Sequence, residues 1–178
     1  MSEKQPELME AGVLVPVYRA EDGALMLVLV RRVEGGLHGG QLALPGGKRI
    51  PSDASMADTA LRESREEIGL DAASVEIVEA LPAMETLTTG FRIFPFLARI
   101  VRPAQWRRDS LEIAEILEVP VEEFARPEAR GEEMRSFGGR PEPKLTRFFR
   151  VKNYKLWGAT YRILEPLIPR LLRREWPL

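Results

Sequence analysis

A glycine-led segment, GKRIPSD at residues 47–53, and an acidic segment, RESREEIGL at residues 62–70, decide the fold of this chain. At 3.6 residues per turn, Glu63, Glu66 and Glu67 fall within an arc of about 100° on one helix. Like charges at this spacing repel one another by roughly a few tenths of a kcal/mol per pair. Because Mg²⁺ and Mn²⁺ prefer carboxylate oxygens and keep positions open for phosphate oxygens, the three acids predict a divalent metal site.

The rest of this region has the pattern of an amphipathic helix. A stripe of small and apolar residues suited to packing against a sheet recurs at helical spacing: Ala57, Ala60, Leu61, Ser64 and Ile68. Ser55 and Asp58 have the spacing of a capping box, and Gly69 is placed as a left-handed C-terminal stop. We therefore expect a helix over residues 56–68 with one buried face and one acidic face. The alternative is a solvated charged face on which neighbouring arginines pair with the acids.

Length and composition indicate a single globular domain spanning residues 1–178, with residues 1–10 expected to form a flexible N-terminus. The absence of cysteine excludes disulfides, thiolate nucleophiles and zinc–thiolate sites. The sequence has no apolar run of about 18 residues, so it predicts no membrane span. The polar first residues do not resemble a secretory signal, so we expect a cytoplasmic protein. The formal net charge of −1 gives no general reason to expect nucleic-acid binding.

Charge is distributed unevenly along the chain. Residues 53–79 contain eight acids against two arginines, whereas residues 126–155 contain nine Lys or Arg against four Glu. An acidic metal-holding region and a separate basic segment suit a polyanionic substrate that binds partly through metal. A solvated basic loop explains the second segment almost equally well.

Apolar and β-branched runs predict several strands around the expected helix. The expected strands are a hairpin over 12–19 and 24–32, a short strand over 41–44, and strands over 75–82, 91–101, 112–119 and 147–151. Pro95 suggests an edge position or a bulge. Residues 126–146 are expected to form a loop or hairpin. A C-terminal helix follows from Trp157, and Pro166 and Pro169 are expected to bend or interrupt it. This order of elements predicts an α/β fold, with a mixed sheet between helices.

With these features in order, the chain resembles a Nudix hydrolase. The family signature is a glycine, five residues, an acid, seven residues, and then Arg-Glu-apolar-x-Glu-Glu-x-Gly-apolar. Gly47 and Asp53 match its first half, and residues 62–70 match its second half. Eight residues, rather than seven, separate Asp53 from Arg62, and Ser64 replaces the apolar residue. The resemblance implies a Nudix-type α/β/α sandwich with a mixed β-sheet and a hydrolase that requires Mg²⁺ or Mn²⁺.

A narrower similarity, to Nudix members that cleave coenzyme A, extends over most of the chain. It rests on LVLVR at 27–31, HGGQ at 38–41, PGG at 45–47, TALRE at 59–63, TTGF at 88–91, PF at 95–96, VPV at 119–121 and KLWGAT at 155–160. Two positions depart from the subgroup pattern: Gly36 stands where an arginine is frequent, and Arg32 where a serine is common. These departures bear on the substrate rather than on the family.

The resemblance assigns roles to particular residues. Glu66 and Glu67 would be the main metal ligands, Glu63 would bind or share a second ion, and a carbonyl of Gly46 or Gly47 would complete the site. Arg62 would orient a glutamate, and Asp53 would help to close the loop onto the helix.

Three further assignments concern the catalytic base and the substrate. The catalytic base would be either one of the helical glutamates or a carboxylate from outside the helix. Glu112 is the first choice outside the helix, and Glu115 is the second. Substrate contacts would come from Arg31, His38 and Gln41, although a strand-end salt bridge explains Arg31 equally well. Trp157 and Tyr161 are most simply core residues, with stacking on adenine as the alternative.

The implied activity is hydrolysis of a nucleoside diphosphate linked to another group. The leading hypothesis is a coenzyme A diphosphatase that releases 4′-phosphopantetheine and adenosine 3′,5′-bisphosphate. A pyrophosphatase for ADP-ribose or another nucleotide sugar or dinucleotide is the second hypothesis. A Nudix-fold binding module without catalysis is the third. The expected partner is a small nucleotide of the coenzyme A type, and a homodimer is a family-level expectation.

Overall fold

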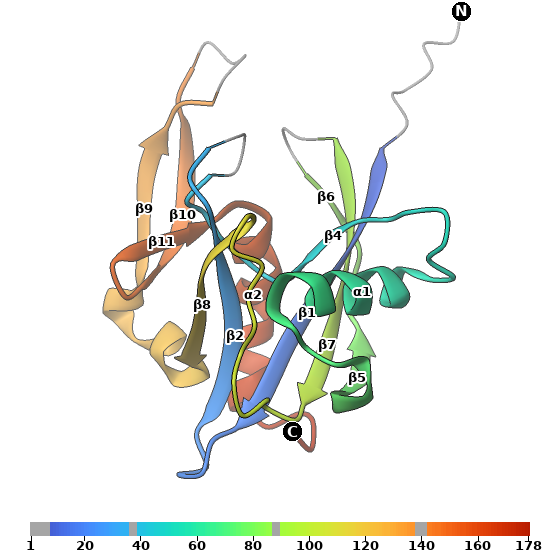
Figure 1. The fold of residues 1–178 in the computed structure, drawn as a ribbon. Helices are drawn as coiled ribbons and strands as arrows, with labels where there is room; N and C mark the ends of the chain where they lie inside the picture. The colour runs from blue at the N-terminus through green and yellow to red at the C-terminus, as the bar shows by residue number, and fades with distance from the viewer. Residues whose placement is uncertain (1–7, 36–38, 87–89, 138–141) are drawn as a thin grey trace, which may run out of the picture.

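The computed structural model describes residues 8–35, 39–86, 90–137 and 142–178, which form eleven strands, two α-helices and three short 3₁₀ helices (Figure 1). The elements in chain order are β1 (Met9–Arg19), β2 (Leu25–Arg32), β3 (Leu42–Ala43), β4 (Gly46–Lys48), α1 (Met56–Ile68), η1 (Ala72–Ser74), β5 (Val75–Ala80), β6 (Met84–Glu85), β7 (Phe91–Ile100), β8 (Ile113–Pro120), η2 (Val121–Ala125), η3 (Pro127–Ala129), β9 (Arg130–Arg135), β10 (Lys144–Val151), β11 (Tyr154–Trp157) and α2 (Gly158–Leu172).

The main sheet is mixed, and its central strands run parallel. Its order is β3-β2-β1-β7-β5, with β4 paired to β1, β6 to β7 and β8 to β2. β1 and β7 pair in parallel over nine residues, and the other pairs are antiparallel. β1 pairs with β4 near its start and with β2 near its end. The glycine-rich segment is therefore hydrogen-bonded into the sheet as β4 instead of forming the free loop that the sequence suggested.

Helices cover both faces of this sheet, which confirms the expected α/β/α sandwich (Figure 1). The core on the α2 side contains Val15, Leu29, Leu97, Leu117, Leu164, Leu167, Ile168 and Leu171. The core on the α1 side contains Leu14, Val28, Val30, Ala60, Ile68, Ala98, Ile100 and Ile113. Neighbouring residues of β1 and β2 serve opposite cores because side chains alternate across a strand.

A second sheet, of order β11-β10-β9, contains much of the basic segment. Lys144 pairs with Arg135 and Phe149 pairs with Arg130, so the hairpin alternative applies to residues 130–135 and 144–146. Phe149 is fully buried and lies 4.8 Å, ring centre to ring centre, from Tyr161 of α2. This packing joins the second sheet to α2 and explains why a segment rich in charge still forms strands.

Three expectations about local structure were wrong. β7 runs unbroken through Pro95 in the middle of the sheet, between β1 and β5. The Pro95 carbonyl accepts from the Leu81 N–H in the gap between β5 and β6, and the proline has no N–H with which to return that bond. α2 continues through Pro166 and Pro169, so the expected interruption was wrong, whereas the expected bend stays a prediction. β1 already starts at Met9, so residues 9 and 10 are not a flexible N-terminus; residues 1–7 lie outside the described residues.

In the described part of the chain, neither helix has the length and apolar character needed to cross a membrane.

Candidate active site

α1 has the bounds and the caps that the sequence predicts. The Ser55 hydroxyl accepts from the Asp58 N–H at 3.1 Å, which satisfies one of the free N–H groups of the first turn. Gly69 ends the helix with φ of 68°, and its N–H donates to the Arg65 carbonyl at 3.0 Å. The helix packs very closely on β1 at Gly12. A Cβ at this position would lie only 2.3 Å from the Met56 carbonyl oxygen. The acidic face of α1 is thereby held at a fixed distance from the sheet.

The two glycines of β4 bring backbone directly against the helical acids. Gly47 pairs with Gly12 and Gly46 with Val13. A Cβ at Gly47 would lie 2.5 Å from Cδ of Glu63, so the Glu63 carboxylate lies against bare backbone. Gly46 has φ of 151°, a conformation that L side chains rarely adopt. Only glycine satisfies both positions, which gives this motif its physical meaning.

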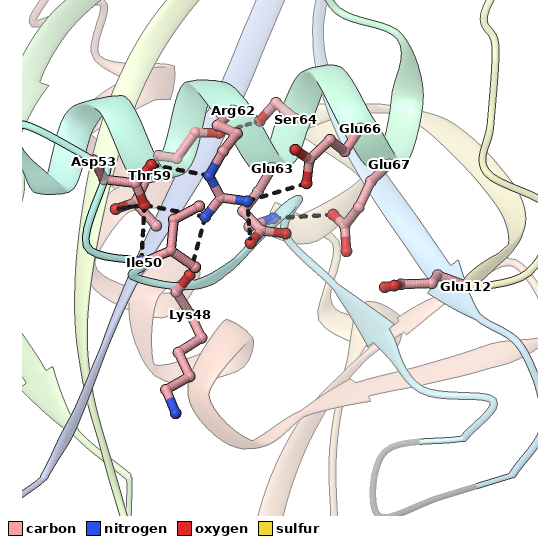
Figure 2. Close-up of polar contacts among 12 residues, drawn as sticks. Lys48, Ile50, Asp53, Thr59, Arg62, Glu63, Ser64, Glu66, Glu67 and Glu112 are labelled. Atoms are coloured by element: carbon pink, nitrogen blue, oxygen red, sulfur yellow. Dashed lines mark hydrogen bonds and ion pairs between the residues drawn. The ribbon is translucent and has the colours of Figure 1, made fainter.

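Arg62 connects the loop before the helix with the acidic face (Figure 2). Its Nε donates to Oδ1 of Asp53 at 2.9 Å, and Nη2 donates to the Lys48 carbonyl at 3.0 Å. Nη1 donates to Glu63 at 2.8 Å and to Glu66 at 3.0 Å. The guanidinium holds the pKa of the buried Asp53 well below its usual range. This is the geometry expected of a residue that orients carboxylates, and it shows how Asp53 ties the loop to the helix.

Glu67 is the most buried of the helical glutamates, with 3% of its surface exposed. Its Oε2 accepts from the Gly46 N–H at 3.0 Å, and its Oε1 lies 3.2 Å from Nη1 of Arg32. Burial raises the pKa of Glu67 to about 7, because loss of water outweighs the contacts with Gly46 and Arg32. Burial also raises the pKa of Glu63. Bringing a cation close would offset both penalties.

Arg32 is a site residue that the sequence analysis did not assign. It contacts Glu67 with one nitrogen and, through Nη2, the Glu112 carboxylate at 3.3 Å. Its neighbour Arg31 points elsewhere: Nη1 lies 3.1 Å from Glu34, and the guanidinium lies 5.3 Å from the centre of the Tyr154 ring. These contacts match the salt-bridge alternative for Arg31.

The two candidate bases outside the helix occupy different surroundings. Glu112 lies just before β8, on the side of Glu67 (Figure 2). Its side chain is 55% exposed, and it shares Arg32 with Glu67. Glu115 accepts from the Tyr154 hydroxyl at 2.8 Å and lies 3.7 Å from Lys152. The structure therefore groups Glu112 with the helical acids and places Glu115 in a separate cluster.

The donor chemistry of the site fits a hard divalent cation. Within the described ranges, no group of three or more His, Asp or Glu side chains is arranged to hold a metal ion. The reason is visible in the contacts: Arg62 binds Glu63 and Glu66, while Arg32 binds Glu67. The ligands available are nevertheless carboxylate and backbone oxygens on one helix face and one glycine strand, which is the set that Mg²⁺ and Mn²⁺ prefer.

A cavity of about 1350 Å³ opens beside the glycine strand, between the main sheet, the second sheet and α2. Its lining includes Gly46, Gly47 and Gln41. Basic side chains dominate its charged residues: Arg32, Lys48, Arg135, Lys144, Arg147 and Arg162, against Glu165. Trp157 and Tyr161 also line it, and the Arg135 guanidinium lies 4.2 Å from the Trp157 ring centre. Trp157 is thus a wall residue and not simply core. His38, a predicted substrate contact, lies outside the described residues.

Comparison with known proteins identifies the family. A model of the NUDIX domain matches residues 9–137. A curated relative from Salmonella dublin, described as uncharacterized Nudix hydrolase NudL, is 34% identical over 121 residues, which cover 68% of this chain and 62% of the relative. Its counterpart from Salmonella newport is 35% identical over 112 residues, covering 63% and 57%. The chain thus spans about three fifths of the length of these relatives.

Solved structures share the fold at low sequence identity. A MutT protein from Methanosarcina mazei Go1 is 19% identical with a TM-score of 0.59, covering 96% of this chain and 99% of that one. The NUDIX domain of Shewanella oneidensis NrtR, solved with ADP ribose, is 16% identical with a TM-score of 0.51, covering 69% and 82%. The family model covers most of the chain, and its match includes the glycine strand and the acidic helix, so this chain belongs to the NUDIX domain family.

Proposed function

We propose that the protein is a metal-dependent hydrolase of nucleoside diphosphates linked to another group, with coenzyme A as its preferred substrate. The observation that carries the proposal is that the glycine strand, against which the Glu63 carboxylate lies, lines a large cavity whose described charged residues are mostly basic. A diphosphate that lies against Gly46 and Gly47 would have its remaining groups in this cavity. Hydrolysis forms a bond from a water oxygen to one phosphorus and breaks the bond from that phosphorus to the bridging oxygen.

Each residue of the site has a physical task in this reaction. Bound Mg²⁺ or Mn²⁺ would neutralise the developing phosphate charge and assist ionisation of water. Glu63, Glu66 and Glu67 would hold the metal, with a Gly47 carbonyl, and Arg62 would keep two of these carboxylates in place. The Glu112 carboxylate would accept the proton of the attacking water, since it lies half in solvent and shares Arg32 with Glu67.

The charge and size of the cavity support coenzyme A as the substrate. Coenzyme A carries a 3′-phosphate in addition to its diphosphate, so it has more negative charge to place than ADP-ribose. Among the described residues of the lining, six Lys or Arg against one Glu suit such an anion. Lys144 and Arg147 belong to β10 of the second sheet and line the same cavity as the glycine strand, so they would be available to bind a second phosphate. The products would be 4′-phosphopantetheine and adenosine 3′,5′-bisphosphate.

A pyrophosphatase acting on ADP-ribose or another nucleotide sugar or dinucleotide is the second candidate. Gly36, at a position where the coenzyme A subgroup carries arginine, favours it, and the NrtR domain shows that this fold can hold ADP-ribose. A binding module without catalysis is a weaker alternative, because Glu63, Glu66 and Glu67 are all present.

Turnover of coenzyme A, dephospho-coenzyme A, ADP-ribose and NADH, measured first with Mg²⁺ and then with Mn²⁺, tests these alternatives. A kcat/KM clearly highest for coenzyme A supports the proposal, and equal values with and without the 3′-phosphate would refute the substrate. Preference for ADP-ribose or NADH would select the second candidate. If every dinucleotide stays intact with either metal, the binding module becomes the better interpretation.

A further inference from the structure

Arg32 stands between the two groups of carboxylates at the site. Its side chain is 34% exposed, and it contacts the 4%-exposed side chain of Glu67 at 3.2 Å and the 55%-exposed side chain of Glu112 at 3.3 Å. A buried carboxylate needs a nearby cation or several hydrogen bonds to remain charged. The contacts of the Glu67 carboxylate are the Gly46 N–H on one oxygen and Arg32 on the other. Arg32 therefore supplies the positive charge nearest to this buried acid.

Strand alternation directs Arg32 to this position. Val28 and Val30 of β2 pack in the core on the α1 side and Arg32 follows at the same two-residue spacing, whereas Arg31 follows Leu29 of the opposite core. The pairing of β2 with β8 also shifts register here, so that Arg31 lies opposite Glu115 while Arg32 lies opposite Ile113. The two consecutive arginines therefore serve different carboxylate clusters. Arg32 also lines the cavity. Its guanidinium can leave Glu67 without crossing the core.

We propose that Arg32 is an internal counter-ion that holds Glu67 and Glu112 until a divalent cation binds, and that the cation and Arg32 compete for the Glu67 carboxylate. This inference rests on the proposed function insofar as that function needs a metal at Glu67. Arg32 is accordingly a positioning residue: it keeps the buried ligand oriented while the metal is absent. It also sets how tightly the metal is held.

Measurement of Mn²⁺ binding without substrate tests the competition directly. In Arg32→Ser the dissociation constant for Mn²⁺, measured by titration calorimetry or by the electron paramagnetic resonance signal of free Mn²⁺, should fall about three- to tenfold, as expected from losing one or two partly exposed ion pairs. Arg32→Lys retains the charge but not the fork, so its constant should lie between those of the wild type and Arg32→Ser.

Lys48→Ser is the matched control. Lys48 lines the same cavity, and its backbone carbonyl accepts from Arg62, so the substitution removes one positive charge near the site without removing an ion pair to Glu67. Its Mn²⁺ constant should change less than twofold. If Lys48→Ser lowers the dissociation constant for Mn²⁺ as much as Arg32→Ser does, the effect comes from the general loss of positive charge near the site. The proposed competition for Glu67 is then wrong. An unchanged or weaker affinity in Arg32→Ser would also overturn it.

Thermal stability is a second readout, measured without metal and then with it. Without metal, Arg32→Ser should have a lower thermal midpoint than Lys48→Ser at pH 8, and saturating Mn²⁺ should close that gap. A gap that persists with Mn²⁺ would show that Arg32 stabilises the fold independently of the metal, against the inference. A wild-type protein that binds no Mn²⁺ at all refutes the proposed function itself. Normal binding and turnover with no effect of Arg32 refutes only this inference.

Discussion

Glu67→Gln should make the metal-free protein more stable at pH 8, although it removes a predicted metal ligand. The folded state raises the pKa of Glu67 from 4.5 to about 7 because the carboxyl is buried. Stability is therefore greatest below 4.5, where both states carry the proton, and it falls as pH rises to 7 and the unfolded chain alone ionises. At about 1.36 kcal/mol per pH unit, this rise corresponds to about 3 kcal/mol of unfolding free energy at pH 8. Glutamine never ionises and escapes this penalty.

Urea unfolding with EDTA at pH 5 and pH 8 measures this effect. Glu67→Gln should gain about 1–3 kcal/mol over wild type at pH 8, because the amide recovers most of the burial penalty, and only about a quarter of that gain at pH 5. Glu66→Gln is the control, since that side chain is 52% exposed and has little burial penalty to lose.

Mn²⁺ at 100 times its dissociation constant should reverse the order, adding about 2.7 kcal/mol to the wild type only. The same substitution should abolish most turnover. A variant that is no more stable at pH 8, or equally stabilised at pH 5, would refute the reasoning.

Three further outcomes are expected. Mn²⁺ affinity should weaken by about tenfold per pH unit below 7, because the metal must displace a proton from Glu67; calorimetry from pH 5.5 to 8 measures it, and a flat profile would contradict this role. Asp53→Asn should lower the unfolding free energy by about 3 kcal/mol at pH 7, since it leaves Arg62 without its buried partner. Because the pair depresses the pKa of Asp53, that loss should shrink below about pH 4, and a constant loss down to pH 3 would argue against the ion pair. Gly12→Ala should destabilise by about 2 kcal/mol or more in urea unfolding, because its Cβ would meet the Met56 carbonyl at 2.3 Å; wild-type stability would show that α1 can shift.

The helix and its caps could be predicted because their determinants are local. Ser55 and Asp58 are one turn apart, and Gly69 immediately follows the last residue of α1. The common face of Glu63, Glu66 and Glu67 likewise follows from spacing alone.

Arg32 could not be predicted in this way, because its contact with Glu67 depends on which face of β2 is covered by α1, and that is settled only by the packing of the sheet. The signal that was present in the sequence is the pair of arginines at the end of an apolar strand, but nothing local says which one faces the acids. The prediction of an edge position or a bulge at Pro95 failed for a similar reason. The proline lies within the sheet at the gap between β5 and β6, and that gap follows from pairing between strands far apart in the sequence.

The second sheet has a consequence for how relatives of this protein should be compared. The family match ends at residue 137, whereas β10, β11 and α2 lie beyond it and contribute Lys144, Arg147 and Trp157 to the cavity. Changes at these positions leave the contacts of Arg62 with the acidic helix intact. The lining of the cavity is therefore free to diverge during evolution while the signature stays constant. Two homologues with the same signature and different β10 sequences should be treated as candidates for different substrates.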